Sequence, residues 1–106
     1  MRRITRLAVN AFYNRYNFKL SNTKVYQADN GNMIMELFGN RIAILTPDNR
    51  LYFCCCGWTS NTTLERLRGL SLNIQKKQGQ LRYAGAIIDP YKEYPATYNE
   101  QYLIRA

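Results

Sequence analysis

Cationic side chains are the residues of this sequence best suited to bind another molecule. Lysine and arginine total 15 against 7 for aspartate and glutamate, so the 106-residue chain has a formal net charge of +8. Such an excess favours a polyanion or an acidic protein surface as partner. The residues predicted to bind nucleic acid or a partner protein are Arg2, Arg3, Arg6, Arg15, Lys19 and Lys24 near the N-terminus, and Lys76, Lys77 and Arg82 further along.

The first 28 residues contain no acidic side chain, and aromatic residues lie between their cations. These aromatic residues are Tyr13, Tyr16, Phe18 and Tyr26. Basic residues mixed with aromatic residues and asparagine are typical of a surface that follows a nucleic-acid backbone. The alternative is that Tyr16 and Phe18 belong to the core and that the arginines only keep the protein dispersed.

Catalysis and metal binding are disfavoured by what the sequence lacks. It has no histidine, which removes the commonest general base and the most frequent metal ligand. Its carboxylates stand singly, and neither a G-x-x-x-x-G-K-[ST] nor a G-x-G-x-x-G motif occurs. We therefore expect no enzymatic activity, no metal and no cofactor.

Three consecutive cysteines, Cys54, Cys55 and Cys56, lie at the end of an apolar run. Neighbouring side chains on a strand point to opposite faces, so three in a row cannot converge on one metal ion. An odd number in one strand does not indicate a disulfide framework. We interpret them as small buried hydrophobic residues in a reducing cytosol.

The stretch "GWTSNTTLERL" (57–67) could form either an anion site or a structural hinge. Thr62 and Glu65 have the spacing of a capping box, which predicts the start of a helix. The amides of a helix N-terminus can receive a phosphate, but the Glu65 carboxylate would compete for the same positive end. A hinge is therefore favoured, with Trp58 predicted to be a buried plug beneath the helix.

The elements that must position these residues follow from the hydrophobic pattern. Residues 2 to about 15 are predicted to be helical, with Ile4, Leu7, Ala8, Ala11 and Phe12 on the apolar face. Residues 17–23 are predicted to form a loop. Strands are predicted at 23–28, 32–38, 41–46 and 50–56, separated by turns at 29–31, 39–40 and 47–49. Four strands joined by tight turns indicate an antiparallel meander.

A short helix and a hairpin are predicted in the second half of the chain. The helix has about two turns, with Leu64 and Leu67 facing the core, Arg66 and Arg68 facing elsewhere, and Gly69 just after its end. The hairpin joins 72–77 to 80–88 through a turn at Gln78-Gly79, and a tail at about 89–106 packs on the surface. We therefore predict an α+β fold in a single compact domain, 1–106: an antiparallel β-meander of five or six strands with an N-terminal helix and a short second helix.

A membrane partner is not expected. No apolar run approaches the roughly 18 residues that a membrane-spanning helix needs. The N-terminal arginines are followed by neither a long apolar stretch nor a cleavage pattern, so we expect no signal peptide.

Four segments resemble a group of small tailed-bacteriophage proteins. They are "AFYNRYNFKLSNTKV", "LFGNRIA", "GWTSNTTLERLRGL" and "NIQKKQGQLRYAG", and the resemblance extends from about Ala11 to Gly85. Its most specific part is a G-W-x-[TS]-N-T-T-x-x-R-L motif, after which Arg68 stands where the group has asparagine. The resemblance implies a phage-encoded protein acting in the cytoplasm of an infected bacterium. It brings no activity and no site residues with it.

The function predicted from charge and resemblance together is a small non-enzymatic phage accessory protein that binds nucleic acid through its basic N-terminal segment. The alternative is a protein that binds and inhibits a host or anti-phage defence complex, such as a CRISPR effector. A third possibility is a minor component of the virion. Both leading functions use a cationic surface, because many such protein targets are acidic.

Overall fold

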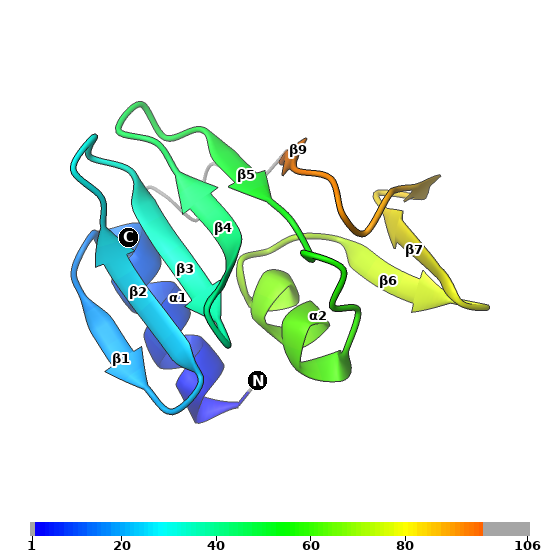
Figure 1. Ribbon diagram of the computed structural model, residues 1–106, viewed down its shortest axis with the longest axis horizontal. Helices are drawn as coiled ribbons and strands as arrows, with labels where there is room; N and C mark the ends of the chain where they lie inside the picture. Colours follow the sequence, from blue (N-terminus) through cyan, green and yellow to red (C-terminus); the bar gives the residue numbers. More distant parts are fainter. Residues whose placement is uncertain (1, 97–106) are drawn as a thin grey trace.

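The computed structural model describes residues 2–96, which form two helices and two antiparallel sheets (Figure 1). The helices are α1 (Arg3–Asn14) and α2 (Asn61–Gly69). The larger sheet contains β1 (Phe18–Leu20), β2 (Thr23–Gln27), β3 (Met33–Leu37), β4 (Asn40–Leu45), β5 (Leu51–Phe53) and β9 (Tyr94–Pro95). The smaller sheet contains β6 (Ile74–Lys77), β7 (Gln80–Tyr83) and β8 (Ala86–Ile87).

The strand order confirms the predicted α+β class. The larger sheet has six strands in the order β1-β2-β3-β4-β5-β9, so strands β1 to β5 form a meander and β9 returns to its edge. Helix α1 lies against one face of this sheet, and α2 lies between the two sheets (Figure 1). The last hairpin does not extend the meander but forms a separate three-stranded sheet, β6-β7-β8.

The buried face of α1 differs from the predicted one. Residues buried on α1 are Thr5, Ala8, Val9, Ala11, Phe12 and Tyr13. The face is rotated because the Tyr13 hydroxyl donates a hydrogen bond of 2.9 Å to the Leu70 carbonyl, which satisfies its polar end inside the protein. Ile4 and Leu7 remain half-buried at the edge of the contact.

The N-terminal half of the large sheet differs from the predicted one in an additional strand and in the position of a turn. The segment predicted to be a loop, 17–23, contains β1, where Phe18 pairs with Val25 and packs against the core. Tyr16 is 47% exposed, so only one of the two aromatic residues assigned to the core in the alternative interpretation lies there. The second hairpin turn is Phe38-Gly39 rather than 39–40, because Leu37 pairs directly with Asn40.

Strand β5 ends before the three cysteines, which therefore do not form part of it. Cys56 and Gly57 both have positive φ, 52° and 78°, and the Trp58 amide donates to the Cys55 carbonyl at 2.8 Å. This tight turn buries Cys55 and leaves Cys54 and Cys56 half-buried. The prediction of three thiols alternating along one strand is thus wrong, although Cys55 does lie in the core.

Helix α2 begins two residues earlier than the capping box predicts. Ser60 is its N-cap, and the Ser60 hydroxyl accepts a hydrogen bond of 3.3 Å from the Thr63 amide. Gly69 is buried in the last turn of the helix rather than lying after its end. Arg66 was predicted to face away from the core, but its side chain is 0% exposed.

Residues 72–96 contain the predicted hairpin and the first part of the predicted tail. The turn at Gln78-Gly79 is confirmed, since Lys77 pairs with Gln80. The strand predicted at 80–88 is broken into β7 and β8. Residues 89–96 run back to the large sheet, where β9 pairs with β5, and residues 97–106 of the predicted tail lie outside the described part of the chain. Within residues 2–96, no helix is long and apolar enough to cross a membrane.

Candidate nucleic-acid interface

The predicted N-terminal cations lie on two different faces of the large sheet. Arg2, Arg3 and Arg6 are exposed at the beginning of α1, which covers the buried face. Lys19 and Lys24 pair with each other on β1 and β2. They point away from α1 because the side chains next to them along these strands point inward. The structure therefore does not gather these five residues on one surface.

Arg15 is engaged within the protein rather than available to a partner. Its Nη2 donates to the Thr46 carbonyl at 2.6 Å and to Asn49 Oδ1 at 3.0 Å. These contacts attach the C-terminal end of α1 to the turn between β4 and β5. Arg15 is thus a structural contact in the described part of the protein.

The second predicted cluster is also divided by strand alternation. Lys76 pairs with Leu81 and Lys77 pairs with Gln80, so the two lysines face opposite sides of the small sheet. Lys76 faces the loop that precedes α2 and lines a pocket there with Gly57 and Thr59. Arg82 is half-buried on β7, where it makes only long hydrogen bonds within the hairpin.

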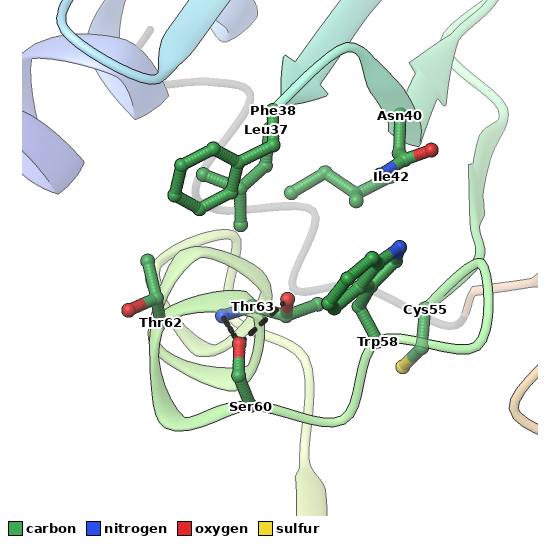
Figure 2. Close-up of a pocket in the computed structure, with 9 residues that line it drawn as sticks. All are labelled: Leu37, Phe38, Asn40, Ile42, Cys55, Trp58, Ser60, Thr62 and Thr63. Carbon is green, nitrogen blue, oxygen red and sulfur yellow. Dashed lines mark hydrogen bonds between the residues drawn. The ribbon is translucent and has the colours of Figure 1, made fainter.

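An apolar groove with a volume of about 430 Å³ lies between the β3–β4 turn and the N-terminus of α2 (Figure 2). Its lining residues are Leu37, Phe38, Asn40, Ile42, Cys55, Trp58, Ser60, Thr62 and Thr63. Phe38 and Trp58 stand on opposite sides of this groove and are 72% and 62% exposed. The prediction that Trp58 is a buried plug is therefore wrong: Leu64 and Leu67 fill the space beneath α2 instead.

Phe38 is held at the groove by the turn between β3 and β4. Phe38 and Gly39 have φ values of 51° and 81°, and positive φ at both central residues is what a type I′ hairpin turn requires. Asparagine and glycine prefer such positions, whereas a bulky aromatic residue is rarely found there. The turn nevertheless presents the Phe38 ring to solvent, so neither core packing nor turn preference explains this residue.

Trp58 is held at the groove by the tight turn at Cys56-Gly57 and by the start of α2. The Gly57 amide donates to the Pro90 carbonyl at 2.9 Å, and a Cβ atom at Gly57 would collide with the Tyr91 ring. Only glycine satisfies both this close approach and the positive φ. Ser60, two residues after Trp58, is the N-cap of α2, so Trp58 lies in a short segment held at both ends.

Two cationic clefts neighbour the groove. Thr62 lines the groove and also a cleft in which Arg2 and Arg68 lie together with Asn61 and Glu65. Gly57 and Thr59, the residues on either side of Trp58 in the sequence, line a pocket that contains Lys76 and Tyr91. We call the groove together with these two clefts the Trp58 surface.

Glu65, the carboxylate among the described residues that line the groove and its two clefts, is engaged by neighbouring groups. Burial raises its pKa, but the Thr5 hydroxyl, which donates to Glu65 Oε1 at 2.6 Å, and the charges of Arg66 and Arg2 outweigh this, so the pKa is lowered overall. Glu65 is also ion-paired with the buried Arg66. The cleft therefore keeps the positive charges of Arg2 and Arg68.

Two of the residues that form this surface could not be identified from sequence patterns. Phe38 is predicted to end the strand at 32–38, and the strand pattern does not show that its ring faces solvent. Trp58 was assigned to the core because its large area usually favours burial. Arg68 was expected to face away from the core, and it does; its Nε donates to the Ile74 carbonyl at 2.8 Å.

The cysteine thiols of the described residues are held in their protonated form. Burial, together with the neighbouring thiols, raises the pKa of Cys55 to about 12, and burial with a Cys54 hydrogen bond raises that of Cys56 to about 11. These thiols are therefore protonated at neutral pH and are weak nucleophiles. Between residues 2 and 96, no three side chains of histidine, cysteine, aspartate or glutamate come together as metal ligands.

Comparison with known proteins identifies one family. The family described as Kyanoviridae Gp96 protein matches residues 1–100, almost the whole chain. No curated protein and no solved structure matches this chain. The match confirms the phage origin implied by the resemblance, while the motif at 57–67 stays a prediction.

Proposed function

Because this chain belongs to the Kyanoviridae Gp96 family of cyanophage proteins, we propose that it is a non-enzymatic phage accessory protein that binds nucleic acid in the cytoplasm of the infected bacterium. The observation that carries this proposal is the Trp58 surface, whose two clefts contain Arg2 and Arg68 in one and Lys76 in the other. Cations placed along a surface neutralise phosphates and release counterions, which supplies the sequence-independent part of nucleic-acid affinity.

The other predicted cations take different parts in this proposal. Arg3 and Arg6 extend the positive charge from Arg2 along α1. Lys19, Lys24 and Lys77 lie on other faces and contribute only long-range attraction, which salt screens over about 8–10 Å. Because one group of cations lies on the Trp58 surface and the other does not, equal charge can be removed from each group and the effects on binding compared.

The experiment compares two triple variants that lose the same charge. The first changes Arg2, Arg68 and Lys76 to glutamine on the Trp58 surface, and the second changes Lys19, Lys24 and Lys77 to glutamine elsewhere. Binding to a mixed-sequence DNA single strand is measured between 50 and 300 mM salt. Each phosphate contact to a single strand contributes about −0.7 to the slope of log K against log salt.

The two variants are expected to behave differently. The first should make the slope less negative by about 2, because about three phosphate contacts are lost, and the second should change it by less than half as much. Melting curves check that both variants fold. Equal losses in the two variants would show that net charge, and not the Trp58 surface, determines binding.

Inhibition of a host or defence protein is the second candidate function. The observation that favours it is the apolar lining of the groove, which also suits a hydrophobic side chain of a protein partner. This candidate predicts weak nucleic-acid binding and a stoichiometric complex with one host protein that survives nuclease treatment. Purification from infected or host cells with and without nuclease distinguishes it from the first proposal.

A further inference from the structure

We propose that the groove between Phe38 and Trp58 binds an unpaired nucleobase, so that the protein prefers single-stranded nucleic acid to duplex. This inference rests on the proposed function and adds the part of the ligand that the groove contacts. Every base has an aromatic face that stacks on an aromatic side chain, and this contact is tolerant of sequence. A base within a duplex is already stacked and paired, and is not available to such a groove.

The shape and chemistry of the groove fit a flat, amphipathic ring. Its volume of about 430 Å³ lies within the range of about 300–1,000 Å³ found for small-ligand sites. Leu37 and Ile42 supply an apolar wall, and the rings of Phe38 and Trp58 stand on either side of the opening (Figure 2). Polar side chains at the edge of the groove, among them Asn40 and Thr62, can hydrogen-bond to the edge of a base.

Charge complementarity favours a nucleic-acid strand over an uncharged partner in the groove. A strand that places one base in the groove must continue beyond it, and the clefts that neighbour the groove carry cations. Arg2 and Arg68 are in the cleft that shares Thr62 with the groove. Lys76 is in the pocket lined by Gly57 and Thr59, which flank Trp58 in the sequence. These cations can neutralise the phosphates on either side of a base that enters the groove.

The backbone at Phe38 provides an independent argument. Phe38 occupies a positive-φ position, where asparagine would be favoured, and its ring is 72% exposed. A non-glycine residue held in this region is strained and is often found at a functional site. Phe38 thus stabilises the folded protein no better than asparagine would at this position. Contact with a ligand would explain why an exposed aromatic residue is found there.

Trp58 provides a direct readout, since it is the one tryptophan of the chain. The experiment titrates the protein with a short mixed-sequence DNA single strand, the same sequence as RNA, the same sequence as a duplex, and inorganic polyphosphate. Indole fluorescence reports stacking, and anisotropy of labelled probes or competition against them reports affinity. The variants are Phe38→Asn and, as a matched control outside the groove, Tyr16→Asn.

Single strands are expected to quench the Trp58 fluorescence, whereas polyphosphate should bind without the same quenching because it has no bases. Phe38→Asn should weaken single-strand binding by about 5- to 150-fold, the range measured for one lost stacking contact. It should leave polyphosphate binding unchanged and should melt at or above the wild-type temperature, because asparagine suits a type I′ turn. Tyr16→Asn should bind single strands like the wild type.

Two results would overturn the inference, and they can be told apart. If single strands bind without quenching and Phe38→Asn binds them as tightly as the wild type, the phosphate-binding function stands and the groove is not a base site. If neither nucleic acid nor polyphosphate binds, the proposed function itself is wrong. A host-protein complex that Phe38→Asn then disrupts would identify a protein side chain as the occupant of the groove.

Discussion

Arg66 shows how far a single residue can depart from its sequence pattern. Its guanidinium is fully buried, where Nε donates to the Thr23 hydroxyl and Nη1 to the Thr5 hydroxyl and to Glu65. Burial lowers the pKa of Arg66. Its Nη2 has no hydrogen-bond partner among the described residues. One side chain thereby connects α2 with α1 and β2.

Replacing Arg66 by alanine is expected to lower the free energy of unfolding by about 3–5 kcal/mol. The alanine variant leaves a cavity where the guanidinium lay, and Thr5, Thr23 and the half-buried Glu65 each lose a hydrogen-bond partner. Urea unfolding measures the change. The matched control is Arg68→Ala on the same helix, which should cost about 1 kcal/mol for its hydrogen bond to the Ile74 carbonyl. Equal costs for the two variants would contradict the structural role assigned to Arg66.

Among the elements, α2 depends most on the residues at its start. It has nine residues, which is too short to be stable without capping and packing. The sequence pattern Thr62-x-x-Glu65 predicts a capping box at its start, but Ser60 makes the cap and Glu65 instead contacts Thr5 and Arg66. Which hydroxyl caps the helix depends on the residue at which the chain leaves the preceding turn. The four-residue pattern Thr62-x-x-Glu65 carries no information about that position.

The two capping assignments predict opposite rankings of two variants. Ser60→Ala should lower the free energy of unfolding by about 0.5–2 kcal/mol, because the Thr63 amide loses its acceptor. Thr62→Ala should stay within about 0.5 kcal/mol of the wild type, as for other surface substitutions. Thermal and urea melts of the two proteins decide between them. A larger loss in Thr62→Ala would restore the capping box.

Strand β1 is an element that the local sequence could not indicate. It has three residues, and Leu20 at its end is 41% exposed. Among residues 2–96, β2 is its only hydrogen-bonded neighbour in the sheet. Patterns that need four or more residues cannot detect such a strand, whereas β2, β3 and β4 have enough alternating or apolar residues to be predicted. A short edge strand such as β1 therefore forms because it pairs with its neighbour, and not because its residues have a high β-strand propensity.

At the scale of the whole molecule, Glu65 makes the contact between α1 and α2 sensitive to pH. Its pKa is lowered in the folded protein, so the unfolded chain binds a proton first as the pH falls. The contribution of Glu65 to stability is therefore complete above the ordinary pKa of about 4.5. It is lost progressively as the pH falls through the lowered, folded value.

This dependence is measured against Glu65→Gln, which cannot ionise. The difference in free energy of unfolding between wild type and variant should be constant from pH 7 to about pH 5 and should decrease below that. Other carboxyl groups titrate equally in the two proteins, so their contribution cancels in the difference between wild type and variant. One of them is Asp48, whose pKa is lowered mainly by a hydrogen bond from Thr46. A difference that does not change between pH 6 and pH 3 would show that Glu65 is not stabilised in its ionised form.

The amino-acid sequence by itself determined the class of fold, most of the strands of the meander, the helical N-terminus and the cationic character of the protein. These features depend on periodicity, turn residues and composition, which are local and can be read along the chain. Tertiary structure alone decided that Phe38 and Trp58 face one groove and that Arg66 is buried. It also decided that Arg2, 66 residues before Arg68 in the sequence, lies with it in one cleft beside the groove. The physical reason is that burial and proximity depend on which elements pack together, and the packing of α2 between two sheets leaves no periodic trace in the sequence.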